Sequence, residues 1–223
     1  GIVTDVARLT DRSSSITIAA TDGSELPRWE AGAHIEFELP AGSRAYSLIA
    51  LDDIPNKAVA YQIAVQREDD GQGGSRAMHQ LKPGDGVSFS GPKNSFAVDT
   101  SRPAVLLAGG IGVTPLISMA TALKARGQSY EFHYAGRSLE VMAFAEELRK
   151  RHQKVLQIHC DDTPTALNLD AVMADLGDAQ LYICGPRGLL DAARTRAEVR
   201  GIPDDQIRFE LFEAAQARSD DSS

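Results

Sequence analysis

Residues 104–115 read AVLLAGGIGVTP, and this stretch decides the fold of the second half of the chain. Residues 104–108 form a continuous apolar run, as expected of a parallel strand that is covered on both faces. Three glycines follow and permit positive φ and close approach to the backbone. Thr114 is suited to cap a helix, and Pro115 to stand in its first turn. The stretch predicts a strand, a turn and a helix N-terminus that binds phosphate, with a ligand-free tight turn as the alternative.

Strands and helices alternate from this stretch to the end of the chain. Apolar runs predict strands over residues 104–108, 130–135, 155–160, 180–184 and 207–212. Helical patterns follow Pro115 and cover residues 139–150, 169–176 and 189–200, with Val141, Met142, Ala145 and Leu148 on one face of the second helix. This alternation predicts a doubly wound, five-stranded parallel sheet.

The N-terminal half has a different rhythm. Short apolar or alternating runs predict strands over residues 2–9, 15–20, 33–39, 43–49, 60–66 and 86–90. Six strands at this spacing predict an antiparallel closed barrel, interrupted by a short helix over residues 75–81 with Ser75 as its N-cap. We expect two domains, 1–100 and 101–214, and the polar residues 215–223 as the start of a linker.

The fourth predicted strand carries Arg44-Ala45-Tyr46-Ser47. Side chains alternate along a strand, so Arg44 and Tyr46 are expected to share one face. A guanidinium grips phosphate with two hydrogen bonds, and a tyrosine ring offers a stacking surface and a hydroxyl. The pair suits a ligand that has both an anionic group and a planar ring. A surface arginine beside a half-buried tyrosine is the alternative.

A second candidate anion site is the segment Gly71-Gln72-Gly73-Gly74-Ser75, which leads into the short helix. Consecutive backbone N–H groups and the serine hydroxyl can form an anion-binding nest, whereas a hairpin loop without a ligand is the alternative. His79 follows closely and is weighed as a contact of the same site, against a role in the core or at its rim.

A third group of candidates follows the predicted parallel strands. Cys184-Gly185-Pro186 ends the fourth of these strands, while Arg137 and Asp161-Asp162 follow the second and third. Ligands of open α/β sheets gather at the carboxyl ends of the strands, so one ligand is expected to reach all of these residues and the glycine turn. A buried cysteine before a Gly-Pro turn is the alternative for the first motif.

Composition excludes several classes of protein. The 223 residues carry a net charge of −8, which argues against a nucleic-acid partner. Cys160 and Cys184 have no zinc-site spacing and cannot hold an iron–sulfur cluster, so no metal site is expected. The sequence has no apolar run of about 18 residues, so no membrane span is indicated. No signal peptide is visible at the given N-terminus. A cytoplasmic location is expected, and the first residue, Gly1, suggests a trimmed chain.

Five motifs in order resemble the ferredoxin–NADP reductase superfamily: RAYS at 44–47, GGSRAMH at 73–79, GGIGVTP at 109–115, CGP at 184–186 and FELF at 209–212. The similarity is greatest to the phthalate dioxygenase reductase and vanillate O-demethylase reductase group. This resemblance implies a flavin-binding barrel that uses FMN rather than FAD, followed by an NAD-binding α/β domain. It also implies reduction of FMN by NADH.

The resemblance also implies roles for single residues. In the barrel, Arg44 would hold the flavin phosphate with Gly73, Gly74 and Ser75, while Ala45, Tyr46, Ser47, Ile63, Ala64 and Val65 would line the ring. In the nucleotide domain, Gly110, Gly112, Thr114 and Pro115 would meet the dinucleotide, and Cys184, Gly185 and Pro186 would lie near the nicotinamide. Ser47, Thr114 and Cys184 would take the catalytic positions, and Phe212 would cover the second face of the flavin.

Members of this group also have a plant-type [2Fe–2S] domain, and this sequence has no such segment. Either the chain is truncated, which we favour, or the iron–sulfur module is separate. The implied function is that of the reductase component of a Rieske-type oxygenase. A stand-alone flavin or ferric reductase and a non-catalytic flavin-binding module are the alternatives. Asp161 and Asp162 could bind ribose hydroxyls and would repel a 2′-phosphate, whereas Arg137 and Ser138 could do the opposite. The residues leave NADH and NADPH open, and the resemblance implies NADH.

Overall fold

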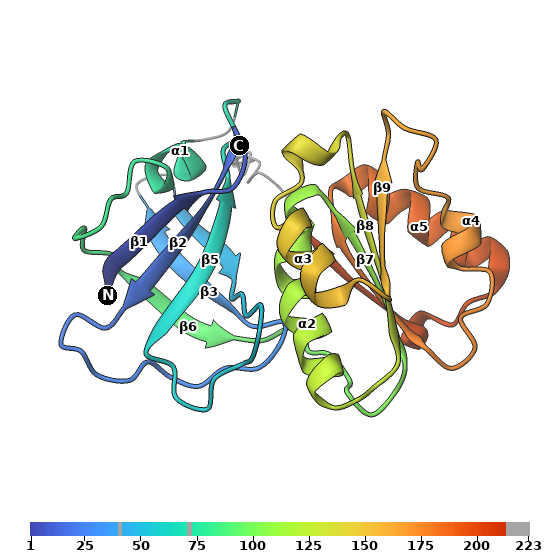
Figure 1. Cartoon of the computed structure of the whole chain (residues 1–223), viewed down its shortest axis with the longest axis horizontal. Helices are drawn as coiled ribbons and strands as arrows, with labels where there is room; N and C mark the ends of the chain where they lie inside the picture. Colours follow the sequence, from blue (N-terminus) through green and yellow to red (C-terminus); the bar gives the residue numbers. More distant parts are fainter. Residues whose placement is uncertain (40–41, 71–72, 213–223) are drawn as a thin grey trace, which may run out of the picture.

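The computed structural model describes residues 1–39, 42–70 and 73–212. Two groups of strands lie side by side, the antiparallel group at the left of Figure 1 and the parallel group at the right. The antiparallel group consists of β1 (Ile2–Arg8), β2 (Ser13–Ala19), β3 (His34–Leu39), β4 (Gly42–Ser47), β5 (Ala60–Gln66) and β6 (Phe89–Lys93), with the short helix α1 (Gly74–Met78) before β6.

The six antiparallel strands form a barrel, as the sequence predicted. They are arranged as two three-stranded sheets, β1-β2-β5 and β4-β3-β6. Backbone hydrogen bonds join the two sheets along both seams. The Ile49 amide donates to the Gln62 carbonyl at 2.8 Å beside β5, and the Val3 amide donates to the Asp85 carbonyl at 2.9 Å beside β1.

Two local predictions in the barrel are wrong. The sixth strand starts at Phe89 rather than at residue 86, because the preceding residues pair with the chain start: the Val87 amide donates to the Gly1 carbonyl at 2.9 Å. The short helix starts at Gly74, and its N-cap is Gly73 at φ 91° instead of Ser75. The Ser75 hydroxyl oxygen accepts from the Glu68 amide at 2.9 Å, which binds it to the preceding loop.

The parallel sheet has the order β11-β10-β7-β8-β9 and confirms the doubly wound prediction. Its strands are β7 (Ala104–Gly109), β8 (Tyr130–Gly136), β9 (Leu156–Cys160), β10 (Gln180–Gly185) and β11 (Ile207–Leu211). The connecting elements are η1 (Gly110–Gly112), α2 (Val113–Ala125), η2 (Leu139–Val141), α3 (Ala145–His152), α4 (Leu169–Val172), α5 (Arg187–Arg200) and η3 (Asp204–Gln206). Helices α2 and α3 cover the face toward the barrel, and α4 and α5 cover the other face (Figure 1).

The helix expected over residues 139–150 is interrupted. Only η2 and α3 are helical, and Phe144 between them has φ 63°. The Tyr134 hydroxyl donates to the Ala143 carbonyl at 3.0 Å, so this backbone is held by the sheet rather than by a helical turn. Val141, expected on the apolar stripe, is 48% exposed. The helix expected over residues 169–176 is the shorter α4, whereas the helix expected over 189–200 begins earlier, at Arg187.

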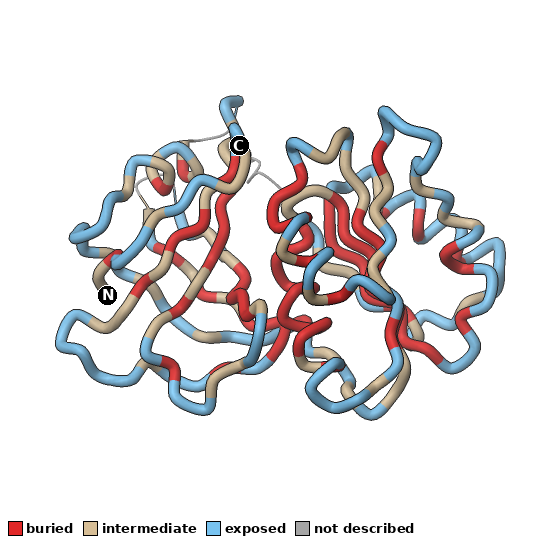
Figure 2. The backbone as a smooth tube through the Cα atoms, in the orientation of Figure 1, coloured by how far each residue is buried: buried red, intermediate tan, exposed pale blue. Residues whose placement is uncertain are grey.

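The barrel and the parallel sheet share one hydrophobic cluster. Ile49, Ala64 and Phe96 from the antiparallel half pack in the same buried cluster as Val113 and Leu116 of α2. The buried segments of both halves face each other across this boundary (Figure 2). Because apolar burial is favourable wherever it occurs, this cluster attaches α2 firmly to the barrel.

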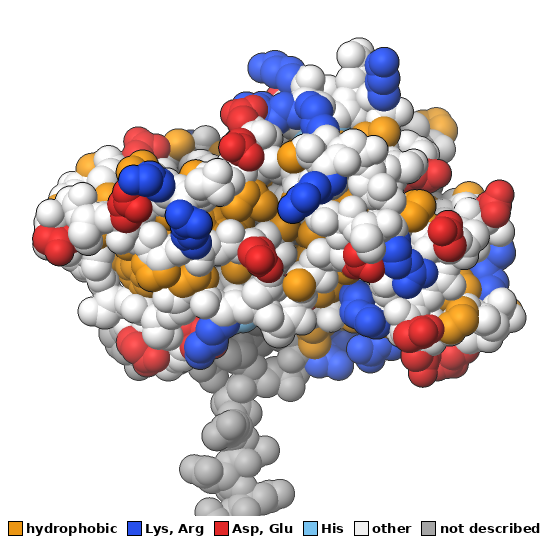
Figure 3. All heavy atoms as spheres, turned by 90° about the horizontal axis from the view of Figure 1, so that it is seen from below, with side chains coloured by type: hydrophobic (Ala, Val, Ile, Leu, Met, Phe, Trp, Pro, Cys, Tyr) orange, Lys and Arg blue, Asp and Glu red, His pale blue; other side chains and the backbone are white. Residues whose placement is uncertain are grey.

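The outer surface carries both signs of charge. Figure 3 shows basic and acidic side chains interspersed on one face, with hydrophobic side chains gathered over the barrel half. Within residues 1–39, 42–70 and 73–212, no helix has the length and apolar character needed to cross a membrane. The predicted linker, residues 215–223, lies outside the described residues. Gly71 and Gln72 of the second candidate anion site also lie outside them.

Candidate functional site

The glycine turn after β7 and the Cys-Gly-Pro turn after β10 lie directly against each other. A Cβ atom at Gly112 would stand 2.4 Å from the Cys184 carbonyl oxygen. A Cβ atom at Gly109 would stand 2.9 Å from Pro186 Cδ, and one at Gly185 would stand 3.0 Å from Gly109 Cα. These glycines therefore let two backbone turns touch, and the structure brings together motifs that are distant in the sequence.

Gly110 differs from its neighbouring glycines. It has φ +53°, and a Cβ atom there would meet nothing within 4 Å. The sequence alone assigned Gly110 and Gly112 to a ligand; in the structure, Gly109 and Gly112 also leave room for close contacts within the chain. Gly110 is the glycine of this turn that borders open space. The η1 turn, which begins at Gly110, packs against β5 of the barrel.

Thr114 lies inside α2 and is not its cap. The N-cap position belongs to Gly112, and the Thr114 hydroxyl donates to the Ile111 carbonyl at 3.1 Å. Pro115 stands two residues after the first helical residue, Val113, within the first turn as expected. Thr114 is not the N-cap because the 3₁₀ turn η1 ends at Gly112 and α2 starts directly after it, at Val113.

The charged candidates after β8 and β9 meet as expected of neighbouring parallel strands. The Asp162 amide donates to the Arg137 carbonyl at 3.2 Å, and the Asp161 amide donates to the Gly136 carbonyl at 3.1 Å. All three charged side chains, those of Arg137, Asp161 and Asp162, are exposed. They lie at the same edge of the sheet as the two glycine turns.

Cys184 is fully buried, and β11 places Glu210 opposite it in the pairing of β10 with β11. Burial, and to a smaller extent the neighbouring Glu210, raises the pKa of the Cys184 thiol well above its ordinary value. Burial also raises the pKa of Glu210 to about 7. Among the described residues, Glu210 Oε2 is buried without a hydrogen-bond partner. Sequence reasoning missed Glu210, although a carboxylate between apolar residues of a predicted strand was a visible signal.

Phe212 comes to the boundary between the two halves. It packs against the hydrophobic cluster that contains Ala64 of the barrel, and Ile111 of η1 packs against the same cluster. The Phe212 amide donates to the Gly185 carbonyl at 3.4 Å. The last described residue therefore joins the β10 turn to the surface of the barrel.

On β4, Arg44 and Tyr46 are half-buried, whereas Ser43 and Ala45 are exposed. This confirms the expected alternation. The Tyr46 ring packs edge-on against Phe37 with centroids 5.7 Å apart, and burial raises the pKa of Tyr46 to about 12. Tyr46 is therefore a neutral ring at physiological pH. Ser47, at the end of the strand, is buried.

Arg44 and the Gly73-Gly74-Ser75 segment converge, although about thirty residues separate them in the sequence. A Cβ atom at Gly74 would stand 3.3 Å from Arg44 Nε, and one at Gly73 would stand 3.6 Å from Arg76 Nη2. Two guanidinium groups therefore flank the start of α1. Such an arrangement of cations and backbone amides suits an anionic group.

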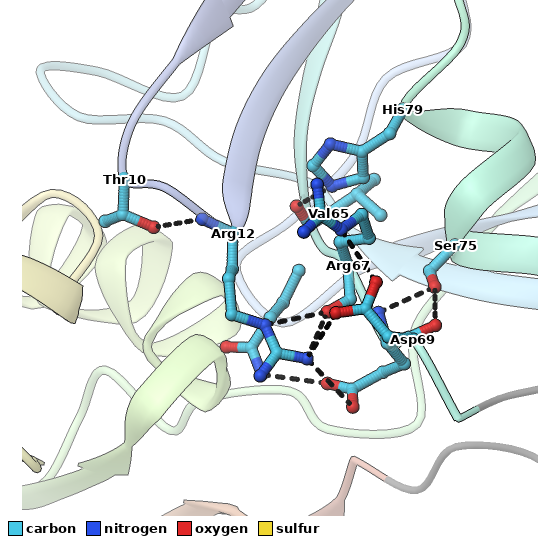
Figure 4. A network of polar contacts seen from close by, with 9 residues as sticks. Thr10, Arg12, Val65, Arg67, Asp69, Ser75 and His79 are labelled. Carbon is cyan, nitrogen blue, oxygen red and sulfur yellow. Dashed lines mark hydrogen bonds and ion pairs between the residues drawn. The ribbon is translucent and has the colours of Figure 1, made fainter.

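The loop before α1 is anchored from several sides (Figure 4). Arg12 Nη2 donates to the Arg67 carbonyl at 2.8 Å, and the Ser75 hydroxyl binds the Glu68 amide at 2.9 Å. His79 Nε2 lies 3.0 Å from the Val65 carbonyl. This contact gives His79 a structural role at the base of α1.

The three candidates on β5 face different ways. Ile63 and Val65 belong to the barrel cluster, whereas Ala64 belongs to the cluster shared with α2. Ala64 is therefore the β5 candidate that lies at the boundary between the barrel and α2. A separate cavity of about 670 Å³ lies between the barrel and the C-terminal half of α2, where Trp29 and Arg126 line it. None of the predicted site residues lines this cavity.

The chain is similar in sequence and in fold to known reductases. No protein-family model matches the chain. The carnitine monooxygenase reductase subunit of Escherichia coli K12 is 36% identical over 218 residues, which cover 94% of this chain and 67% of that protein. The vanillate O-demethylase oxidoreductase of Acinetobacter baylyi is 33% identical over 220 residues, which cover 96% of this chain and 68% of that protein.

A solved structure of phthalate dioxygenase reductase, described as modular and as transferring electrons from pyridine nucleotides to [2Fe–2S], matches with a TM-score of 0.86. It is 32% identical, and the match covers 98% of this chain and 69% of that one. The chain therefore belongs to the reductases of oxygenase systems, within the ferredoxin–NADP reductase superfamily. It is an electron-transfer oxidoreductase and a flavoprotein, as its sequence predicted, and it spans about two thirds of the length of these relatives.

Proposed function

We propose that this protein accepts electrons from NADH on FMN and delivers them singly to a [2Fe–2S] centre that serves a Rieske-type oxygenase. The observation that carries the proposal is the meeting of both candidate sites at one boundary. The η1 turn packs against β5, and Phe212 lies on the cluster that contains Ala64. A flavin on the barrel and a nicotinamide at the glycine turn would thus be neighbours.

We propose that the barrel residues hold the flavin as its mononucleotide. We assign its phosphate to Arg44, Gly73, Gly74 and Ser75, because the guanidinium lies against the start of α1. We assign its ring to Ala45, Tyr46, Ser47, Ile63, Ala64 and Val65, with Phe212 over the second face. A bound flavin accepts two electrons as a hydride and returns them one at a time, and this chemistry belongs to the cofactor.

The parallel-sheet residues fit a nicotinamide dinucleotide. We assign its contacts to Gly110, Gly112, Thr114, Pro115, Arg137, Asp161, Asp162, Cys184, Gly185 and Pro186. Gly112 would contribute its backbone to the dinucleotide, and its lack of a side chain also leaves room for the Cys184 carbonyl. The neutral, buried Cys184 thiol serves as a positioning group rather than a proton donor or acceptor. The paired carboxylates Asp161 and Asp162 favour NADH over NADPH.

The partners follow from the family. The relatives named above are reductases of a carnitine monooxygenase and a vanillate O-demethylase, so we propose an oxygenase as the electron acceptor here. Residues 1–100 would form the flavin domain and residues 101–214 the nucleotide domain, ahead of a [2Fe–2S] module. Both cysteines are free and buried, which suits the reducing cytoplasm that we propose as the location.

The visible spectrum, followed by mass analysis of the released cofactor, tests the proposal. Yellow protein that releases FMN and bleaches with NADH supports it. Released FAD contradicts the FMN assignment, and a clear preference for NADPH contradicts the NADH assignment. Protein that binds no flavin on reconstitution refutes the function. Rapid reduction of cytochrome c without any iron–sulfur partner points instead to a stand-alone reductase.

A further inference from the structure

Helix α2 carries a buried polar stripe on the side that faces the barrel. Thr114, Ser118 and Thr121 are spaced by four and three residues and therefore share one helix face. Their exposed fractions are 2%, 0% and 4%. Buried hydroxyl groups are costly unless they are hydrogen-bonded, so the partners of this stripe indicate its purpose.

Two of these hydroxyls bind the barrel segment that directly follows Ser47. The Ser118 hydroxyl donates to the Leu48 carbonyl at 2.8 Å, and its oxygen accepts from the Ala50 amide at 3.0 Å. The Thr121 hydroxyl donates to the Ala50 carbonyl at 2.8 Å. The Thr121 hydroxyl also lies 3.4 Å from the Leu51 carbonyl, so the two side chains contact four backbone groups of the antiparallel half.

The remaining amides of this segment are bound on the barrel side. The Leu48 amide donates to the Ala33 carbonyl at 2.8 Å, and the Ile49 amide donates to the Gln62 carbonyl at 2.8 Å. The segment is thus held between the barrel and α2. A slide of α2 along the segment would leave Leu48 and Ala50 with unpaired buried backbone groups, which restricts the helix to one register.

The same helix begins at the glycine turn. Thr114 precedes Ser118 by four residues, a rise of about 6 Å along α2. Ser47, at the proposed flavin site, directly precedes Leu48 in the sequence. A short path of covalent bonds and hydrogen bonds therefore joins the two proposed cofactor sites. The apolar contacts around it are not directional, whereas hydrogen bonds fix distance and angle.

We propose that Ser118 and Thr121 are positioning residues that hold the proposed flavin strand in register with the nucleotide turn. This inference rests on the proposed function. Hydride transfer between two bound cofactors needs reacting atoms about 3–3.5 Å apart. A misplacement of about 1 Å can slow such a reaction about a hundredfold. The hydroxyls act through the backbone of residues 48–50 and touch neither cofactor.

The test compares Thr121→Val and the double variant Ser118→Ala/Thr121→Val with two controls. Thr121→Ser keeps the hydroxyl. Tyr134→Phe removes a buried hydroxyl that bonds within the parallel-sheet half, to the Ala143 carbonyl at 3.0 Å. Rapid-mixing absorbance gives the rate of flavin bleaching at saturating NADH, and titrations give the dissociation constants of NADH and FMN.

We expect bleaching to slow by about tenfold in Thr121→Val and by up to about a hundredfold in the double variant. Both dissociation constants should stay within about twofold of the wild-type values, and both control variants should keep the wild-type rate. Equal slowing in Tyr134→Phe, or an unchanged rate in the double variant, would overturn the inference. Wild-type protein that NADH does not bleach would instead refute the proposed function.

Domain alignment gives a readout that needs no activity. Residual dipolar couplings of both halves should fit one alignment tensor in the wild-type protein. In the double variant, the two halves should require separate tensors or show reduced couplings. A single tensor with unchanged magnitude in the double variant would show that the apolar cluster fixes the register without the two hydroxyls.

Discussion

Gly112→Ala is the substitution for which the structure gives the sharpest expectation. Gly112 has φ −60° and ψ −4°, so alanine adopts this backbone without conformational strain. The difficulty is space, because the new Cβ atom would stand 2.4 Å from the Cys184 carbonyl oxygen and 2.7 Å from Gly185 Cα. Both neighbours are backbone atoms, so no side-chain rotation relieves the overlap.

The expected loss of stability follows from two opposing effects. Overpacking of this kind costs about 1–3 kcal/mol, and contact with fixed backbone favours the upper end of that range. Replacing glycine also restricts the unfolded chain, which returns about 0.4–1 kcal/mol. We expect a net loss of about 2 kcal/mol in the free energy of unfolding. For a chain of this size, that loss lowers the Tm by roughly 4–8 °C.

Gly110→Ala is the matched comparison in the same turn. Its Cβ atom would meet nothing within 4 Å, but its φ of +53° costs alanine about 1 kcal/mol. Urea denaturation of both variants, with NADH titration of each, separates packing from binding. Gly110→Ala should lose nucleotide affinity with a small loss of stability, whereas Gly112→Ala should lose mainly stability. Neutral surface substitutions change the free energy of unfolding by up to about 0.5 kcal/mol. If Gly112→Ala changed it by no more than that, the argument from the close contact with Cys184 would be refuted.

Three further predictions concern single side chains. Arg44→Ala should weaken FMN binding more than tenfold through loss of a charged hydrogen bond, with little change in urea stability; a variant that keeps its flavin but unfolds more easily would make Arg44 structural. Burial raises the pKa of Glu210 from 4.5 to about 7, so the folded protein binds the extra proton and its stability should fall as pH rises between these values. Glu210→Gln should abolish that part of the pH dependence in denaturation titrations, and an unchanged profile would contradict it. Because burial raises the pKa of the Cys184 and Cys160 thiols, iodoacetamide should label them only after unfolding, and fast labelling of folded protein would disprove their enclosure.

Regular elements were predictable where local pattern and burial agree. The run 104–108 is apolar at every position, and in the structure Leu106 and Ala108 face α2 while Val105 and Leu107 pack in the cluster on the opposite face. Parallel strands covered on both faces require this composition, so the sequence signal was unambiguous. The alternation on β4 was equally local, because a strand has a period of two.

The errors arose where distant groups hold the backbone. Residues 142–144 have helical composition, but the Tyr134 hydroxyl binds the Ala143 carbonyl and Phe144 turns left-handed. Ser75 has the composition of an N-cap, but the Glu68 amide takes its hydroxyl oxygen. Such contacts depend on chain segments whose proximity no local pattern encodes.

The sequence by itself determined which residue types could serve each site: glycines where chain or ligand comes close, an arginine beside a tyrosine on one strand face, and a strand–helix alternation that sends several turns to one sheet edge. Only the tertiary structure decided which of these residues contact other parts of the chain and which border open space. Gly112 accommodates the Cys184 carbonyl while Gly110 borders open space, and Ser118 and Thr121 join α2 to the end of β4. The physical reason is that excluded volume and hydrogen bonding act between atoms that meet only after folding, about seventy residues apart along the chain.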